Sequence, residues 1–378
     1  MPTPVPTPTP TPTPPPPVTG LTQSENIATF TNPFALKIMP DGRFLVTQKS
    51  NPGGLIIVTA QGAKTVVSNV PDSIGLLDVV LAPDFATSRI IVFSYIVRDT
   101  SAPRVGRAKD DPSVFPERLM VARAKLLEGA GIAQLSEVQE IFRQDPTIVA
   151  FPGSGEFGGR IVYTFDDKYL IISSGDRQEL DKNLLFSTSN NLGKMIRLRA
   201  DGSVPTDNPF SSTQGAKPEI WTLGSRNAYG LVFTPDTRLW SSEMGPKGGD
   251  ELNIILPGRN YGWPAVSNGD NYDGTPIPRH SPGDGFEAPR FSWNPVIAPA
   301  GLIYYDGDEF GAWRGSLLLT GLQFKGIVRV QPSGDNAQEV QRIELGDRIR
   351  DIARGPGGSL WIITDGSLGA LRQLKPVF

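Results

Sequence analysis

A tight turn followed by a short apolar strand recurs along the chain, and this repeat limits the fold more than any other feature. Turn residues (Gly, Pro, Asp) precede alternating leucine, isoleucine and aromatic residues, the pattern of a half-buried β-strand. Four clear and two looser copies span residues 40–47, 165–173, 235–241 and 356–364, and 83–95 and 313–319. Six copies give roughly 60 residues each, enough for four strands and a loop, which is typical of a β-propeller. We predict an all-β fold, a six-bladed β-propeller.

An array of β-sandwiches with coincidental turns is the alternative, but it would need a linker near the middle of the chain, and none is visible. Helical periodicity is scarce, and residues 117–127 are the best candidate for a helix.

The N-terminal segment differs in composition from the rest of the chain. Its first 17 residues hold ten of the 36 prolines. Proline fixes φ and lacks an amide donor, so this Thr/Pro repeat cannot join a helix or sheet. We predict that residues 1–20 are a linker, disordered or in the polyproline II conformation, and that residues 21–378 are the propeller.

Two roles are open for this linker: a tether to a second module or an anchor, or a ligand for a proline-recognition domain. A tether of this kind is typical of exported proteins, so we expect an extracellular or periplasmic location. The sequence has no apolar signal-peptide core and no apolar run of about 18 residues, and we expect no membrane span.

The composition excludes several kinds of site. The chain has no cysteine and one histidine, His280, which rules out thiolate nucleophiles, Cys-ligated metals and multi-His metal sites. Its 36 Lys and Arg residues nearly balance 39 Asp and Glu residues. A nucleic-acid partner is therefore not expected.

Three clusters could carry chemistry. Residues 242–253 combine glycines, a proline, Asp250 and Glu251, which suits either a calcium site or a solvated acidic turn. Arg348 and Arg350 share one side of a strand, so they bind a polyanion or pair with the neighbouring acids Asp347 and Asp351. The third cluster is the glycine-rich segment 153–160, followed by residues 174–177, which is neither a P-loop nor a nucleophile elbow.

Together the motifs resemble one family. In chain order they are GLLD at 75–78, PDF at 83–85, FGGR at 157–160, GDR at 175–177, NLGK at 191–194, RN at 226–227, GP at 245–246, GDELN at 249–253, NYGWP at 260–264, AP at 298–299 and RIRD at 348–351. The chain from about Thr29 to Leu374 resembles the soluble PQQ-dependent sugar dehydrogenases, the glucose/sorbosone dehydrogenase family. That resemblance also implies a six-bladed propeller.

The resemblance implies a cofactor site and two calcium sites. The quinone PQQ would be held by Arg226, Asn227, Arg348 and Arg350, with Lys325 near one of its carboxylates. The carbonyl groups of Gly245 and Pro246 would bind the calcium ion beside PQQ, and Asp250 would support their loop. A second calcium ion would use Glu251, Tyr261 and one of Asp270 or Asp273.

Two departures from the family pattern concern the chemistry. Glu156 stands where the family has its histidine base, and His280 lies in an unrelated loop, where we interpret it as structural or solvated. The family also carries a glutamine just before the GLLD motif, where this chain has Asp72-Ser73-Ile74.

The expected function is therefore the oxidation of a sugar or polyol by hydride transfer to PQQ, with calcium bound and an external electron acceptor. Glu156 would be the base, with Asp176 and Arg226 beside it. One alternative is a catalytically retired propeller that binds carbohydrate or protein. A calcium-dependent hydrolase is another, although it would not need the arginine pair.

Overall fold

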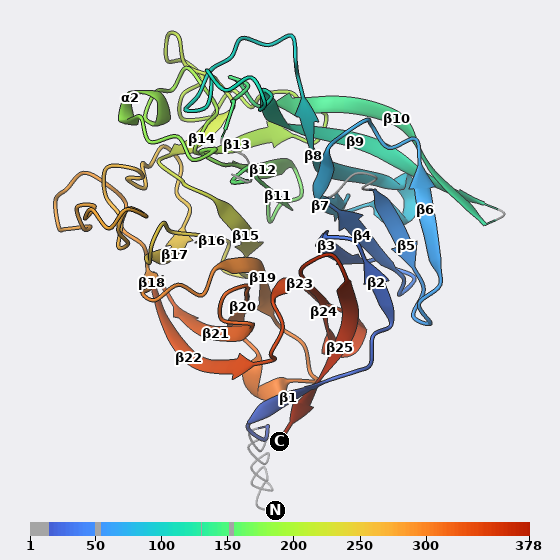
Figure 1. Cartoon of the computed structure of the whole chain (residues 1–378). Coiled ribbons are helices and arrows are strands. Elements are labelled where there is room, and N and C mark those ends of the chain that lie inside the picture. Colours follow the sequence, from blue (N-terminus) through green and yellow to red (C-terminus); the bar gives the residue numbers. More distant parts are fainter. Residues whose placement is uncertain (1–14, 50–53, 130, 151–154) are drawn as a thin grey trace, which may run out of the picture.

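A computed structural model describes residues 15–49, 54–129, 131–150 and 155–378. In this part of the chain the strand pairs are antiparallel except for β6 with β10, and the sheets are arranged radially around a common axis (Figure 1). Two turns of helix, α1 (Phe85–Ser88) and α2 (Lys182–Leu185), and two 3-10 turns, η1 (Gly311–Trp313) and η2 (Pro356–Gly358), lie in connections. The fold is all-β, as predicted.

The largest sheet joins two four-stranded halves. Two residue pairs of β6 and β10, which run parallel, connect them. The sheet order is β3-β4-β5-β6-β10-β9-β8-β7, with β3 Pro33–Ile38, β4 Phe44–Gln48, β5 Leu55–Val58, β6 Lys64–Ser68, β7 Gly75–Leu81, β8 Ile90–Arg98, β9 Glu117–Gly129 and β10 Ile132–Arg143.

The next sheets of the described chain have four strands each, in chain order. They comprise β11 Gly158–Tyr163, β12 Tyr169–Ser174, β13 Lys194–Arg199 and β14 Ile220–Leu223; β15 Ala228–Phe233, β16 Leu239–Glu243, β17 Asp250–Ile254 and β18 Phe291–Trp293; and β19 Pro299–Tyr305, β20 Ser316–Gly321, β21 Gly326–Ser333 and β22 Asn336–Glu344.

The last sheet brings the two ends of the described chain together. It contains β23 Ile349–Arg354, β24 Leu360–Thr364 and β25 Gly369–Val377, with β1 Gly20–Gln23 and β2 Ala28–Phe30 both paired to β25. Val18 is also buried, in the apolar cluster around Leu374. Packing thus includes Val18 and β1 begins at Gly20, next to the predicted boundary between residues 20 and 21. Most of the predicted linker, residues 1–14, lies outside the described residues.

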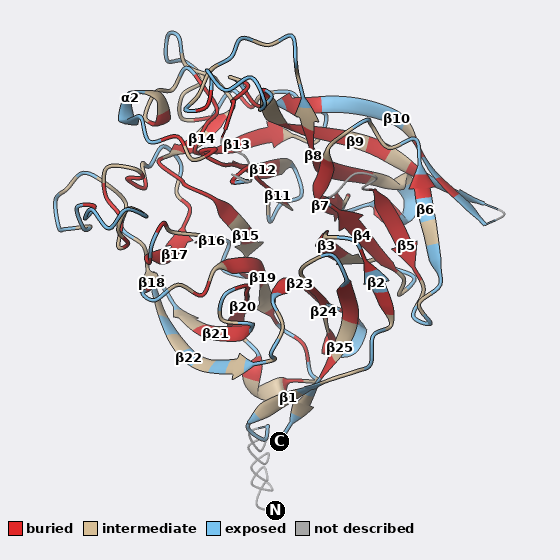
Figure 2. Ribbon diagram, viewed as in Figure 1, coloured by how far each residue is buried: buried red, intermediate tan, exposed pale blue. Residues whose placement is uncertain are grey.

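The innermost strands form a closed ring. Each of β3, β7, β11, β15, β19 and β23 contacts the next, and β23 contacts β3 again. Buried residues are concentrated on the inner strands, whereas the outer strands β10 and β22 are largely exposed (Figure 2). Loops from every sheet thus meet near the axis, so residues that are distant in the sequence come together there.

The repeated turn has a fixed place in this architecture. Its copies precede β4, β8, β12, β16, β20 and β24, always the second strand of a unit, next to the innermost one. The turn-and-strand prediction is confirmed, and the repeat marks the hairpin that leads outward from the axis.

The predicted helix at residues 117–127 is wrong. These residues lie in β9, which pairs with β8 on one side and β10 on the other. Burial alternates over part of the strand and its middle is buried on both faces. Pairing on both edges outweighs the weak helical preference of this segment.

Candidate active site

Three residues predicted to act in catalysis lie at the same ends of neighbouring strands. Glu156 comes just before β11, Asp176 follows β12, and Arg226 precedes β15. The close approach of two of these segments requires Gly175, because a Cβ atom there would lie 1.9 Å from the carbonyl oxygen of Glu156. Glu156 itself has φ of +52°, a left-handed conformation that is uncommon for residues other than glycine.

An ion pair joins the predicted base to the predicted cation. Oε1 of Glu156 lies 2.6 Å from Nη2 of Arg226, and both side chains are at most 10% exposed. The other carboxylate oxygen of Glu156, Oε2, is buried without a hydrogen-bond partner among the described residues. One oxygen is thus engaged by Arg226, and the other is enclosed next to Asp176.

Asp176 is fully buried next to Glu156. Its Oδ2 accepts a hydrogen bond from Nε1 of Trp263 at 2.7 Å, and its Oδ1 accepts one from the backbone N–H of Gln178 at 2.9 Å. Burial, and next the charge of Glu156, raise the pKa of Asp176 well above its usual value. The two acids therefore form a coupled pair in which burial and mutual repulsion favour the protonated form of Asp176.

Arg177 holds the base segment in place and does not pair with the base. Its guanidinium lies 3.3 Å from the ring centre of Phe157, and its Nε donates to the carbonyl oxygen of Gly155 at 3.0 Å. Its acidic partner is Glu117, at 3.5 Å. The residues on both sides of Glu156 are therefore fixed from the neighbouring segment.

A cavity of about 380 Å³ opens beside the acid pair. Asp176, Arg226, Pro246 and Trp263 line it, and Tyr272 and Asp273 stand at its rim. The hydroxyl group of Tyr272 accepts a hydrogen bond from Nη2 of Arg226 at 3.2 Å. The cavity therefore joins predicted catalytic, cofactor and metal residues.

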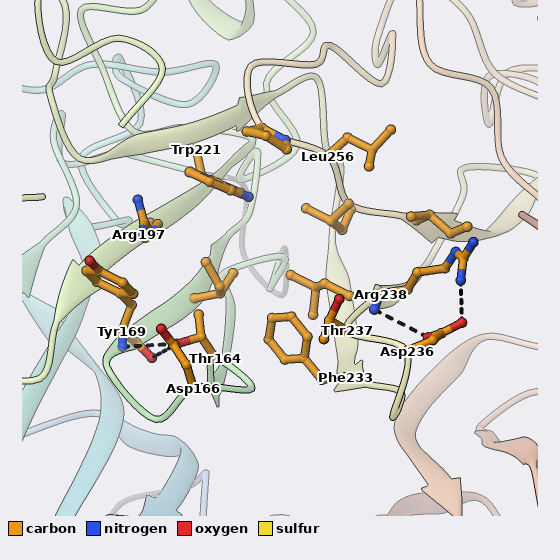
Figure 3. Close-up of a pocket in the computed structure, with 15 residues that line it drawn as sticks. Thr164, Asp166, Tyr169, Arg197, Trp221, Phe233, Asp236, Thr237, Arg238 and Leu256 are labelled. Carbon is orange, nitrogen blue, oxygen red and sulfur yellow. Dashed lines mark hydrogen bonds and ion pairs between the residues drawn. The ribbon is translucent and has the colours of Figure 1, made fainter. Parts of the chain in front are cut away.

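A larger cavity, about 530 Å³, contains none of the predicted site residues. It lies at the opposite strand ends, between the β11–β12 and β15–β16 turns, with Trp221, Tyr169 and Phe233 in its wall (Figure 3). Its charged groups already have partners, as Asp236 does in Arg238. The smaller cavity is therefore the candidate active site.

The predicted arginine pair shares a carboxylate that sequence reasoning missed. Nε of Arg348 lies 3.0 Å from Oδ2 of Asp365, and Nη2 of Arg350 lies 2.7 Å from Oδ1 of the same residue. Pairing with Asp347 and Asp351 was the alternative, and it is wrong. These acids bind Arg372 and Arg160 instead, because adjacent residues of a strand point to opposite sides.

Tyr229 connects the arginine pair to the acid pair. The guanidinium of Arg350 lies 5.9 Å from its ring centre, and Phe34 packs edge-on against the same ring at 5.4 Å. Burial raises the pKa of Tyr229, and the positive charge of Arg350 opposes this rise only in part. The hydroxyl group of Tyr229 is hydrogen-bonded to Asn227. Asn227 and Arg350 are thus both neighbours of Tyr229.

The loop predicted to hold the first calcium ion is fixed by Asp250. Its Oδ1 accepts a hydrogen bond from the backbone N–H of Gly245 at 2.9 Å, and its Oδ2 accepts two from the backbone of Ile297 and Ala298. The carbonyl oxygen of Gly245 accepts a hydrogen bond from Nη1 of Arg226 at 2.8 Å. Arg226 therefore contacts both the base and a predicted calcium ligand.

A second acid pair lies next to this loop. Glu243 of β16 and Glu251 of β17 face each other across the strand pair. With Tyr261, they line a cavity of about 10 Å³, close to the room that one water molecule or ion needs. Burial and the charge of Glu251 raise the pKa of Glu243 to about 8, and burial raises that of Glu251 to about 7.

The other predicted metal ligands lie apart from this pair. Asp270 is 2.6 Å from Nη2 of Arg279, and Asp273 accepts two hydrogen bonds from Thr275. The hydroxyl group of Tyr261 is engaged with the backbone of Ile254 and Leu256. Within the described ranges no three Asp, Glu or His side chains form a metal-binding group, so a cation here would need main-chain oxygens.

Glu156, Asn227, Arg348 and Arg350 are not among the residues that line the cavity of about 380 Å³, and Lys325 and His280 also lie outside it. Lys325 is exposed in the turn between β20 and β21. The side chain of His280 is 6% exposed, with Nε2 3.9 Å from Oε1 of Glu251, so the solvated interpretation is wrong and the residue is buried. Burial lowers the pKa of His280.

The sequence did not identify four residues of the site as functional: Tyr229, Glu243, Trp263 and Asp365. Trp263 lies in the NYGWP motif at 260–264 and Glu243 in the segment 242–253, so the sequence carries a local signal for both. Tyr229 and Asp365 have no local signal, because their partners are far away in the sequence.

Comparisons with known proteins agree with this geometry. The family model described as Glucose / Sorbosone dehydrogenase matches residues 30–373. Aldose sugar dehydrogenase YliI of Escherichia coli is 37% identical over 371 residues, covering 91% of this chain and 90% of that protein.

Solved structures show the same likeness. The soluble aldose sugar dehydrogenase of Escherichia coli in the apo-form has a TM-score of 0.83 and 34% identity, covering 94% of this chain and all of that one. The PQQ-bound aldose sugar dehydrogenase of Streptomyces coelicolor has a TM-score of 0.71 and 25% identity, covering 95% and 98%. The chain therefore belongs to the glucose/sorbosone dehydrogenase family of soluble PQQ-dependent sugar dehydrogenases.

Proposed function

We propose that this chain is a six-bladed β-propeller that binds PQQ and calcium and oxidises a sugar or a related alcohol. The observation that carries the proposal is the buried acid pair beside a cavity that Arg226 also lines. Membership of the family supports the reaction class, and the ring of inner strands supports the blade count.

The residues present fit an anionic quinone with carboxylate groups. Arg226 and Asn227 precede the innermost strand β15, and Arg348 and Arg350 stand at the start of the innermost strand β23. Charged or polar N–H groups of this kind bind carboxylates strongly. Nε of Arg226 and Oε2 of Glu156 are buried without hydrogen-bond partners in the described chain. Such atoms are costly unless another group satisfies them. Lys325, which is exposed in the turn between β20 and β21, would approach a cofactor carboxylate as the family resemblance implies.

When bound, PQQ supplies a quinone that accepts hydride from the carbon bearing the substrate hydroxyl. In our proposal Oε2 of Glu156 takes the proton of that hydroxyl as the hydride leaves. Arg226 holds Glu156 in place through their ion pair, and Asp176, whose pKa burial raises, faces the base. The carboxylate thus replaces the histidine of the family pattern.

A calcium ion fits the loop around Gly245 and Pro246, because hard cations prefer carbonyl and carboxylate oxygens. Asp250 already orders this loop through three backbone hydrogen bonds. A second cation, if Glu251 and Tyr261 hold it, would have Glu243 as its other carboxylate neighbour, since Asp270 and Asp273 have different partners.

The remaining parts of the proposal concern partners and location. A sugar or polyol is the substrate, and an external acceptor reoxidises the cofactor. We also propose an extracellular or periplasmic location, with the Thr/Pro segment as a link to a second module or an anchor. In the described part of the structure no helix is long and apolar enough to cross a membrane.

A retired propeller that binds carbohydrate or protein is the second candidate, and one observation favours it. The same guanidinium, that of Arg226, contacts Glu156 and the carbonyl oxygen of Gly245. It weakens the carboxylate as a base and competes with a cation for the carbonyl group.

Dye reduction with a panel of aldoses and polyols separates the two candidates. The proposed enzyme, loaded with PQQ and calcium, reduces the dye, and Glu156→Gln abolishes this activity. Inactive wild-type protein together with an active Glu156→His variant would establish a retired relative that still binds the cofactor.

A further inference from the structure

We infer that Trp263 is a positioning residue for the acid pair of Glu156 and Asp176, an inference that rests on the function proposed above. Its indole Nε1 donates to Oδ2 of Asp176 at 2.7 Å, and its ring centre lies 5.2 Å from the guanidinium carbon of Arg226. One side chain therefore touches both the acid that holds the proton and the cation that pairs with the base.

Trp263 is itself held firmly. Its side chain is buried in an apolar cluster with Ile148, Leu185, Leu192 and Ile277. Its backbone N–H donates to the carbonyl oxygen of Gly224 at 3.1 Å. The preceding residue, Gly262, has φ of +92°, and a Cβ atom there would lie 2.2 Å from Val266. The indole N–H therefore points at Asp176 from a fixed frame.

The direction of its effect follows from what surrounds Asp176. Glu156 faces it from the segment before β11, Arg226 from the segment before β15, and Arg177 follows it in the chain. The charges of Arg226 and Glu156 also act on the pKa of Glu243. Hydrogen-bond donors to a carboxylate favour its ionised form, so the Trp263 N–H opposes the burial and the charge of Glu156 that favour a proton on Asp176.

The loss of this N–H has a specific consequence. Asp176 then keeps its proton to higher pH, and its carboxyl group loses one of the two donors that orient it towards Glu156. The pH above which Asp176 adds a second negative charge beside the base therefore rises. Trp263 thereby sets the pH at which Asp176 becomes charged beside the base.

The test compares Trp263→Phe with a protein that carries benzothienylalanine at position 263, in which sulfur replaces the indole N–H and the ring shape is kept. The full chain, labelled with ¹³C at aspartate carboxyl carbons and free of cofactor, is titrated by NMR, with Asp176→Asn to assign the signal. We expect the midpoint of Asp176 to rise by about one pH unit or more in both proteins, because a hydrogen bond to a charged group is being removed.

A matched control comes from the opposite part of the fold. Nε1 of Trp361 donates to Oγ of Ser359 at 3.0 Å, far in sequence from the acid pair, so Trp361→Phe should leave the midpoint unchanged. In the loaded enzyme the alkaline limb of the pH profile of kcat/KM, where Asp176 loses its proton, should move upward with the same two Trp263 changes.

The outcomes separate this inference from the proposed function. An unchanged Asp176 midpoint in both Trp263 proteins overturns the inference, even if Glu156→Gln abolishes dehydrogenase activity. A raised midpoint in a protein that fails to bind PQQ supports the positioning role and contradicts the proposed function.

Discussion

Oε1 of Glu156 lies 2.6 Å from Nη2 of Arg226, and Nη1 of the same guanidinium donates to the carbonyl oxygen of Gly245. A single side chain therefore links the residue in the position of the family's base to the loop proposed for calcium. A change of charge at Glu156 or beside the carbonyl group of Gly245 therefore acts on the other through the guanidinium of Arg226. The chemistry of the site depends on how Glu156 behaves beside a permanent cation.

Glu156→Gln keeps the shape of the side chain and removes its capacity to take a proton. We expect kcat/KM for aldose oxidation to fall by about 10²- to 10⁴-fold, the usual contribution of a general base. Binding of PQQ should change much less. Dye-reduction kinetics and a cofactor titration on the same preparation measure the two effects.

Gln178→Ala is a control for this experiment, since its amide lies 3.4 Å from Oε1 of Glu156 and carries no proton in the proposed reaction. A Glu156→Gln enzyme with wild-type kcat/KM would show that this carboxylate is not the base.

Arg350→Gln should weaken PQQ binding, because the guanidinium is 5% exposed and fixed by Asp365 next to Tyr229. One charge-assisted hydrogen bond contributes about 1.5–3 kcal/mol, so we expect the Kd to rise by about 10- to 100-fold. Arg314→Gln removes an exposed arginine at 55% exposure and should leave the Kd unchanged. Equal affinities for Arg350→Gln and wild type would place the cofactor elsewhere.

Gly175→Ala should disturb the acid pair from the backbone. The added Cβ atom would lie 1.9 Å from the carbonyl oxygen of Glu156, so the two segments have to separate. We expect a loss of about 1–3 kcal/mol in the free energy of unfolding and a fall in activity. Gly129→Ala, where the space is open, is the matched control. Denaturant unfolding measures the stability of both variants. Equal free energies of unfolding for Gly175→Ala and Gly129→Ala would show that the segments at Gly175 and Glu156 are not in close contact.

The pair of Glu243 and Glu251 predicts how stability depends on pH in chelator-treated protein. The pKa of Glu243 is raised from 4.5 to about 8 in the folded chain. Between these values the folded state binds more protons than the unfolded state, so the free energy of unfolding falls as the pH rises through this window. Glu243→Gln should flatten the fall.

Tm measured from pH 5 to pH 9 tests this expectation, with Glu137→Gln, at an exposed site, as the control. The account is wrong about this pair if Tm stays constant over the range or if Glu243→Gln leaves the slope unchanged.

The fold could be predicted because its signal is local. Each copy of the repeated turn links the first and second strands of a unit, so its residues report on their own hairpin, as at residues 40–47 before β4. The mistaken helix at 117–127 shows the limit, since β9 is determined by pairing with β8 and β10 on both edges.

The site could be predicted only in part, for the same reason. Glu156, Asp176 and Arg226 lie in short motifs and meet as expected. The partner of the arginine pair was missed, because Asp365 is 15 and 17 residues away in the sequence and arrives from the end of β24. Trp263 contacts Asp176 across 87 residues, a relation that only the closed ring of strands creates.

Titration of the chelator-treated full-length protein with PQQ and calcium, followed by quinone absorbance, tests the central claim most directly. The account predicts saturable binding of one PQQ per chain that depends on calcium and is weakened in Arg350→Gln. Absence of saturable binding in the presence of calcium would contradict it.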